Sequence, residues 1–306
     1  MLKVHANRFV WFFLAVYAAA VSCLAASGIP LGDVLGAGLM LGLGLPLVAW
    51  IACLGMPQPA PPQAWTSGDG RLLLLLLAWI VVFLAFKGPL LDHLVSHAAD
   101  QRLRDTVNTA LKIAAFIAIP GVLLAWQGRG WEQAGKATAA IPRIAAAFLL
   151  VAVAALAVQY LMGSQFQKLL SGDYASRRLA VGSALCFVWM SIEAGLVEEF
   201  FFRWYLQSRL AAWTGSQASA VLLGALIFGV AHAPGMILRG AGVAEGMGAS
   251  PPVLATFAYA IAVPGLAGLV FGLIWARTRS FLPLVLLHGF VDALSNTAAF
   301  MDTWHL

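Results

Sequence analysis

The chain has 306 residues, of which 61% are hydrophobic and 10% charged, and its mean hydropathy is +0.88. Soluble domains carry roughly 45–50% apolar and about 25% charged residues, so this composition excludes a soluble globular protein and predicts a polytopic membrane protein. The formal net charge of +5 does not indicate a nucleic-acid partner, because the cations lie mainly between apolar runs, where they favour lipid headgroups.

The first apolar run covers residues 9–26. A cleaved signal peptide has a similar pattern, but this run is nearly long enough to cross a bilayer and more runs follow at once. We therefore expect an uncleaved first span. Further candidate spans lie at residues 31–55, 72–88, 107–126, 144–163, 179–203, 218–232, 253–276 and 281–301. The sequence predicts an all-α bundle of about eight or nine transmembrane helices, with a catalytic core in the last four.

The run at 218–232 is short for a bilayer core of about 30 Å that a helix crosses at 1.5 Å per residue. We expect it to be tilted, buried among its neighbours, or longer than its apolar residues suggest. The loops between spans are too short to hold a soluble domain, and the Gly-rich loop at residues 233–252 is expected to be flexible. Three cysteines, within apolar segments and far apart, support neither a disulfide framework nor a thiolate metal site: Cys23, Cys53 and Cys186.

The most unusual stretch is Glu198-Glu199-Phe200-Phe201-Phe202-Arg203, which lies in or beside a long apolar segment. A charged side chain at a helix centre costs roughly 2.5–3.5 kcal/mol, so an acidic pair inside a span indicates a functional site. Glu199 and Arg203 share a helix face, whereas Glu198 is rotated by about 100°. Arg203 can therefore neutralise one carboxylate and leave the other free to act as a general base. Taken alone, the stretch is equally consistent with an interfacial ion pair.

Two later spans carry histidines. The span at 218–232 ends in Phe228-Gly229-Val230-Ala231-His232, and the last span places His288, Asp292 and Asn296 on one stripe. Such a stripe must face protein or water rather than lipid, although by itself it would more readily serve to hold helices together. Combined with the glutamate pair, these groups supply a base, proton carriers and hydrogen-bond donors. That is the inventory for hydrolysing an amide.

These motifs resemble those of the CAAX prenyl endopeptidases and bacteriocin-processing enzymes, the Abi or CPBP family of intramembrane proteases. The family pattern is Glu-Glu-x-x-x-Arg, then Phe-x-x-x-His, then His-x-x-x-Asn or Asp, each on its own membrane helix. It matches, in order, at Glu198, Glu199 and Arg203, at Phe228 and His232, and at His288 and Asp292. The resemblance implies a protease core at residues 179–306, and residues 1–178 would be membrane helices of unknown role.

The resemblance also implies the roles of single residues. Glu198 would activate water with help from His232, and His288 and Asp292 fall on the positions that stabilise the oxyanion. An ionised Asp292 would repel an oxyanion, so it must be protonated or else orient His288. Asn296, one turn further on, is a candidate for the missing donor. The candidate catalytic residues are thus Glu198, Glu199, Arg203, His232, His288 and Asp292.

Two Glu and two His on separate helices also fit a zinc site. The helical zinc signature His-Glu-x-x-His is absent from the chain, and we favour a mechanism without a metal or another cofactor. Milder roles are expected for the other polar residues within spans. Asp33 is expected at an interface, Lys112 is expected to snorkel or to pair with Asp105 or Asp92, and Glu193 is expected in a pocket wall or helix contact.

The expected reaction is hydrolysis of a peptide bond in a protein or peptide already held at the lipid bilayer. The substrate would be a C-terminal sorting helix, a leader peptide or a lipidated terminus. The abundance of Ala, Gly, Leu and Val suggests a high-GC bacterial source, so the first two substrates are favoured and the bacterial inner membrane is the expected location. Two alternatives stay open: a proton-coupled transporter whose buried Glu and His relay protons, and a binding or immunity member of the same family that does not cleave.

Overall fold

The computed structural model describes residues 2–62, 64–96, 100–128, 130, 137, 139–172, 174–239 and 252–306, with the side chains of residues 2–7 and 239 left out. Throughout these residues the regular structure is helical, which confirms the predicted all-α class. Nine helical stretches in the described chain are long and apolar enough to cross a membrane: Arg8–Ala26, Leu31–Ala52, Ser67–Leu94, Gln101–Trp126, Ile141–Met162, Ser176–Thr214, Gln217–Leu238, Val253–Thr278 and Phe281–Trp304. The protein is a multi-pass membrane protein.

Several spans are built from more than one helical element. In chain order the elements are α1 (Leu2–Ala26), α2 (Leu31–Ala37), η1 (Gly38–Gly44), α3 (Leu45–Ala52), α4 (Ser67–Leu94), α5 (Gln101–Ile113), η2 (Ala114–Ala118), α6 (Ile119–Trp126), α7 (Ile141–Met162), α8 (Ser164–Ser171), α9 (Ser176–Met190), η4 (Ser191–Leu196), η5 (Glu199–Gln207), α10 (Ser208–Thr214), α11 (Gln217–Arg239), α12 (Val253–Ala262), α13 (Pro264–Thr278) and α14 (Phe281–Trp304). The η elements are π-helical, a form that is rare and often found at functional sites.

Helix α11 is longer than the predicted span at residues 218–232, and it extends into the predicted loop at residues 233–252. The helix does not end at His232 but runs on to Arg239, with Pro234 inside it. A proline inside a membrane helix is tolerated because neighbouring helices and small local adjustments satisfy the backbone group that it frees. The part of the predicted loop before residue 240 is therefore helical, and residues 240–251 lie outside the described chain. Of the three options for this span, the greater length is confirmed, and the helix also packs among its neighbours α13, α12 and α1.

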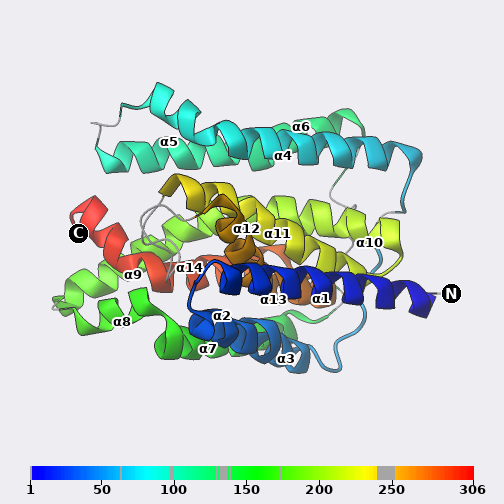
Figure 1. Ribbon diagram of the computed structural model, residues 1–306, viewed down its shortest axis with the longest axis horizontal. Helices are drawn as coiled ribbons and strands as arrows, with labels where there is room; N and C mark the ends of the chain where they lie inside the picture. The colour runs from blue at the N-terminus through cyan, green and yellow to red at the C-terminus, as the bar shows by residue number, and fades with distance from the viewer. Residues whose placement is uncertain are drawn as a thin grey trace.

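The helices that follow residue 178 lie between two outer groups (Figure 1). Helices α4, α5 and α6 run along one edge of the molecule, and α2, α3 and α7 run along the opposite edge. Between them, α11 packs against α13, α12 and α1, and α14 packs against α9, η4 and α7. Helix α4 also contacts α11, and η2 contacts η5. The N-terminal helices thus enclose the segment that carries the predicted motifs.

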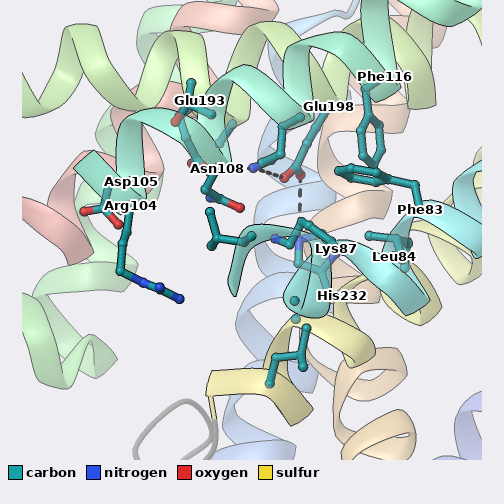
Figure 2. A pocket seen from close by; sticks show the side chains of 18 of the residues that line it. Phe83, Leu84, Lys87, Arg104, Asp105, Asn108, Phe116, Glu193, Glu198 and His232 are labelled. Atoms are coloured by element: carbon teal, nitrogen blue, oxygen red, sulfur yellow. Dashed lines mark hydrogen bonds and ion pairs between the residues drawn. The ribbon is translucent and has the colours of Figure 1, made fainter. Parts of the chain in front are cut away.

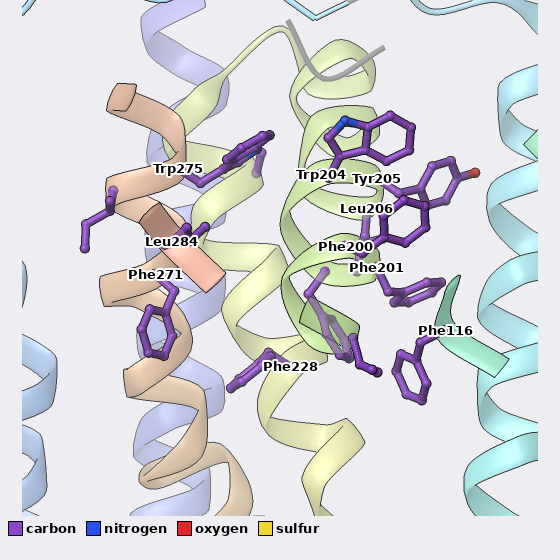
Figure 3. Packing of buried hydrophobic residues seen from close by; sticks show 14 of the residues in the cluster. Phe116, Phe200, Phe201, Trp204, Tyr205, Leu206, Phe228, Phe271, Trp275 and Leu284 are labelled. Carbon is purple, nitrogen blue, oxygen red and sulfur yellow. The ribbon is translucent and has the colours of Figure 1, made fainter. Parts of the chain in front are cut away.

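Aromatic side chains join the α4–α6 group to the central helices (Figure 3). Phe116 of η2 lies edge-on to Phe83 of α4 and to Phe201 of η5, with ring centroids 5.8 and 5.6 Å apart. Phe202 continues the series to Phe228 of α11, at 5.1 Å and again edge-on. Each such pair contributes about 0.5–1.5 kcal/mol beyond the burial of its area. This aromatic chain fixes the distance between α5 and the glutamate pair.

The turns at one end of the bundle hold α11 and α14 in register. Arg279, between α13 and α14, has a left-handed φ of 48°. Its guanidinium donates from Nη1 to Ser208 Oγ and from Nη2 to Gln217 Oε1, both at 2.9 Å. Burial and the nearby Arg209 guanidinium lower the pKa of Arg279 to about 10. One side chain therefore ties the start of α14 to the start of α11, the two helices that carry the histidines.

Candidate active site

The three sequence motifs meet inside the bundle. Glu198 lies at the junction of two π-helical segments, directly before η5, and Glu199 and Arg203 belong to η5 itself. His232 comes from α11, and His288 and Asp292 come from α14. Neighbouring residues on a helix point about 100° apart, so the two glutamates can reach different partners although they are adjacent in the chain.

Glu198 occupies the centre of this site. Its Oε2 atom lies 3.6 Å from His232 Nε2 and 3.9 Å from His288 Nε2. Its side chain is 12% exposed, and it lines a pocket. A carboxylate oxygen that faces two imidazoles across such distances, with access from a pocket, is well placed to take a proton from a small molecule bound beside it.

Glu199 is enclosed, in contrast to its neighbour. Its side chain has no exposed surface; Oε2 lies 3.4 Å from Arg203 Nε and Oε1 lies 2.7 Å from His288 Nδ1. The Arg203 guanidinium is also buried and sits over the Phe228 ring, with its central carbon 4.2 Å from the ring centroid. A buried ion pair needs such extra contacts, since taking two charges out of water is costly. Arg203 therefore holds Glu199 in place, and Glu199 orients the ring of His288.

Each histidine has one ring nitrogen fixed, which leaves the other to face Glu198. His232 Nδ1 lies 2.7 Å from the main-chain oxygen of Phe228, one turn earlier in α11, so this nitrogen donates its N–H. His288 Nδ1 is fixed by Glu199, and its ring stacks on Phe271 with centroids 4.5 Å apart. The Nε2 atoms of both rings consequently point toward Glu198 Oε2, one from α11 and one from α14.

Asp292 and Asn296 follow His288 along α14. Asp292 Oδ2 lies 3.6 Å from His288 Nε2, so His288 faces a carboxylate through each ring nitrogen. Asn296 is exposed, and its side-chain amide donates to the main-chain oxygen of Asp292 at 2.8 Å. One of its N–H groups is thus already used, which weakens the suggestion that Asn296 replaces a donor at the oxyanion. The contact to His288 favours an orienting role for Asp292.

Sequence reasoning missed one member of the site. Lys112, at the end of α5, was expected to pair with Asp105 or Asp92, but it pairs with neither. Its Nζ lies 2.7 Å from Glu193 Oε1 and 3.5 Å from Glu198 Oε1. The signal in the sequence was a cation inside an apolar span, which must find a partner within the bundle. Glu193 lines the pocket, one of its two expected roles. Asp33 lies exposed in the first turn of α2.

A pocket of about 820 Å³ opens onto Glu198 and His232 (Figure 2). Helices α4 and α5 form one wall, and α9, η4, η5, α11 and α14 form the other. In Figure 2 the aromatic rings of Phe83 and Phe116 lie on one side of Glu198, and the polar side chains of Arg104 and Asp105 lie on the other. The volume of the pocket is in the range typical of ligand sites, about 300–1,000 Å³. The pocket can hold an extended chain segment with an apolar side and a polar side.

The side chains of the site are of types that can bind a metal ion. Among the residues whose placement is described, no group of three or more His, Cys, Asp or Glu side chains could hold a metal ion together. A structural or catalytic zinc site takes three or four such ligands at about 2.0–2.3 Å. The residues present do not fit that requirement, and no step of the chemistry below passes through a metal.

Part of the chain is similar to a known protein family. A family model described as "Rce1-like: Type II CAAX prenyl endopeptidase Rce1-like" matches residues 180–294. The matched range contains the two glutamates, both histidines and Asp292, but not Lys112. No curated protein and no solved structure matches the chain.

Proposed function

We propose that the protein hydrolyses a peptide bond by means of a water activated by Glu198, and the match of residues 180–294 to a family of type II CAAX prenyl endopeptidases supports this proposal. One observation carries the proposal. The motifs of three separate helices converge so that Glu198 Oε2 faces the Nε2 atoms of His232 and His288, at 3.6 and 3.9 Å, on the wall of a pocket. A base, two imidazoles and a cavity are the parts that amide hydrolysis requires.

In the first step Glu198 takes a proton from a water molecule, and the water oxygen attacks the carbonyl carbon of the scissile bond. The electrons of the C=O bond move to its oxygen and form an oxyanion. The proposed donor to this oxyanion is Nε2–H of a doubly protonated His288, whose Nδ1–H is held by the Glu199 carboxylate at 2.7 Å. A preorganised donor at such a position contributes about 10²–10³-fold to the rate.

In the second step the tetrahedral intermediate collapses. The oxyanion re-forms the carbonyl, the C–N bond breaks, and the leaving nitrogen receives the proton that Glu198 took from water. His232 assists this transfer, since its Nε2 faces Glu198 while its Nδ1–H is held by the Phe228 carbonyl. The products are a new carboxylic acid and a new amine, so atoms and charges balance without a further reactant. Transfer of the acid proton to the amine then leaves a carboxylate and an ammonium group.

Glu199, Arg203 and Asp292 complete the site as positioning groups in this proposal. Glu199 holds Nδ1 of His288, Arg203 balances the buried charge of Glu199, and Asp292 faces Nε2 of His288 from one turn along α14. An ionised Asp292 beside a developing oxyanion would act against it, so its assigned role is to orient the imidazole.

The proposed substrate is a protein or peptide segment held at the bilayer: a C-terminal sorting helix, a leader peptide or a lipidated terminus. Support comes from the nine apolar helices of the described chain and from the two-sided lining of the pocket. A segment that is already in the membrane can enter between helices without crossing water. The bacterial inner membrane is the proposed location.

The test uses a panel of three membrane-tethered reporters, one for each substrate type, incubated with the purified protein in detergent and analysed by mass spectrometry. The wild type is expected to cleave at least one reporter, and His232→Ala is expected to lose most of that activity. Cleavage that survives a chelator supports the glutamate mechanism, whereas loss on chelation with rescue by zinc would overturn it. If no reporter is cleaved and buried Glu and His instead support proton-coupled uptake in liposomes, the transporter alternative replaces this proposal.

A further inference from the structure

Lys112 is a cation brought to the site by a helix outside the segment that matches the protease family. It lies in α5, and both carboxylates that it pairs with, Glu193 and Glu198, belong to the matched residues 180–294. Its side chain is 13% exposed, and Nζ is placed between Glu193 Oε1 at 2.7 Å and Glu198 Oε1 at 3.5 Å. An intramembrane lysine that bridges two carboxylates is costly to maintain and therefore marks a functional contact.

The two oxygens of Glu198 have different partners. Oε1 faces Lys112, whereas Oε2 faces the two histidines at 3.6 and 3.9 Å. A carboxylate that is held through one oxygen cannot rotate freely, so its other oxygen keeps a fixed direction. The ammonium group has three donors and can bind Glu193 and Glu198 at the same time.

The segment that carries Lys112 is itself rigidly attached. Trp79 Nε1 of α4 donates to the main-chain oxygen of Ala115 at 2.9 Å, three residues after Lys112. Phe116, one turn after Lys112, packs on Phe201 and Phe202, with ring centroids 5.6 and 6.0 Å away. These contacts set the position of α5 against η5, so the ammonium is presented to Glu198 by the fold and not by a flexible loop.

We propose that Lys112 is a positioning residue for the general base: anchored by Glu193, it holds Oε1 of Glu198 so that Oε2 is directed at the water to be activated. This inference rests on the proposed function, because it assigns Lys112 a role only through Glu198. It also assigns α5, a helix outside the matched segment, a part in the chemistry.

The experiment compares Lys112→Met, Lys112→Arg and the double variant Lys112→Met/Glu193→Gln, with the reporter that the wild type cleaves. The proposal predicts that Lys112→Met lowers kcat by about 10–100-fold and changes KM by less than about threefold, since misplacing a catalytic group costs rate more than binding. Lys112→Arg keeps a cation at the same place and is expected to recover at least part of kcat.

The double variant separates this role from simple charge balance. If Lys112 served only to neutralise Glu193, removing both charges would restore the wild-type kcat, and that result would overturn the proposal. The double variant is instead expected to be as slow as Lys112→Met. A wild-type kcat in Lys112→Met, or no recovery in Lys112→Arg, would also overturn it.

Folding is checked by gel filtration and by the thermal unfolding midpoint in detergent. The double variant serves as the test even if Lys112→Met does not fold, because it leaves no unneutralised Glu193. If the wild type cleaves the reporter and the Lys112 variants keep the wild-type kcat, the positioning role of Lys112 is refuted and the proposed function still stands. Absence of cleavage by the wild type would refute the proposed function itself.

Discussion

At the residue scale, two adjacent glutamates differ because their surroundings differ. Glu199 is fully buried between Arg203 and His288, so its carboxylate is committed to holding other side chains. Glu198 lines the pocket, and Oε2 lies beyond hydrogen-bonding distance of both histidines. A glutamate thus holds other side chains at position 199 and is the proposed base at position 198.

Replacing Arg203 is expected to lower the stability of the protein. Arg203→Met leaves the buried Glu199 carboxylate without its cation, a change that costs about 3–5 kcal/mol in the free energy of unfolding. Arg203→Lys keeps the charge but loses the guanidinium contact with Phe228, whose ring centroid lies 4.2 Å from the central guanidinium carbon. We expect both variants to unfold at lower temperature than the wild type in detergent, Arg203→Met more so. Equal midpoints for Arg203→Lys and the wild type would show that the contact of the guanidinium with the Phe228 ring contributes nothing.

At the element scale, the site depends on how closely η4 and α14 approach. A Cβ atom on Gly289 would lie 2.6 Å from the Ser191 main-chain nitrogen, and Cβ on Gly195 would overlap the carbonyl oxygen of Val285. Real Cβ atoms do not come that close, so glycine is required at both positions. Because His288 directly precedes Gly289, this approach also sets the distance from His288 to Glu199.

Gly289→Val tests this packing. The added side chain must push α14 away from η4, and a shift of about 1 Å at His288 is expected to lower kcat by about 10²-fold. The matched control is Gly121→Ala in α6, where a Cβ atom would meet nothing within 4 Å. Cleavage rates are measured after gel filtration has shown that each variant is folded. Wild-type activity in Gly289→Val would contradict the assigned helix contact.

At the scale of the whole molecule, the pocket belongs to both halves of the chain. Elements α4, α5 and η2 supply one wall, with residues from Phe83 to Phe116, and the segment after residue 178 supplies the other. The proposed division into N-terminal helices and a protease core therefore separates parts that share one cavity. We expect the N-terminal helices to determine which substrates fit.

Asn108→Trp tests the shared wall without touching the proposed catalytic groups. Asn108 lines the pocket from α5 (Figure 2), and an indole there would occupy the space meant for substrate. We expect kcat/KM to fall by about tenfold or more, which corresponds to about 1.4 kcal/mol. Val122→Trp, at an exposed position of α6, is the control for the added ring. Equal kcat/KM in Asn108→Trp and the control would mean that substrate does not occupy this part of the pocket.

The apolar runs and the motif spacing were enough to predict the all-α bundle and the helices that carry the site, since hydropathy and four-residue steps are local properties. The full length of α11 could not be predicted, because the surroundings of Pro234 decide whether a helix continues through it. The π-helical turns around Glu198 have no local signature. The partner of Lys112 was also out of reach, because Glu193 and Glu198 lie 81 and 86 residues further along the chain and only the fold brings them together.

The central claim is that the Glu198 carboxylate activates water, and the most direct measurement compares Glu198→Gln with Asp302→Asn. Both replace a carboxylate by an amide of the same shape, but Asp302 is 71% exposed and pairs only loosely with Arg178, at 3.6 Å. With the cleaved reporter, we expect Glu198→Gln to lose about 10²–10⁴-fold in kcat, the contribution of a general base, while Asp302→Asn stays at the wild-type rate. Undiminished cleavage by a folded Glu198→Gln would contradict this claim.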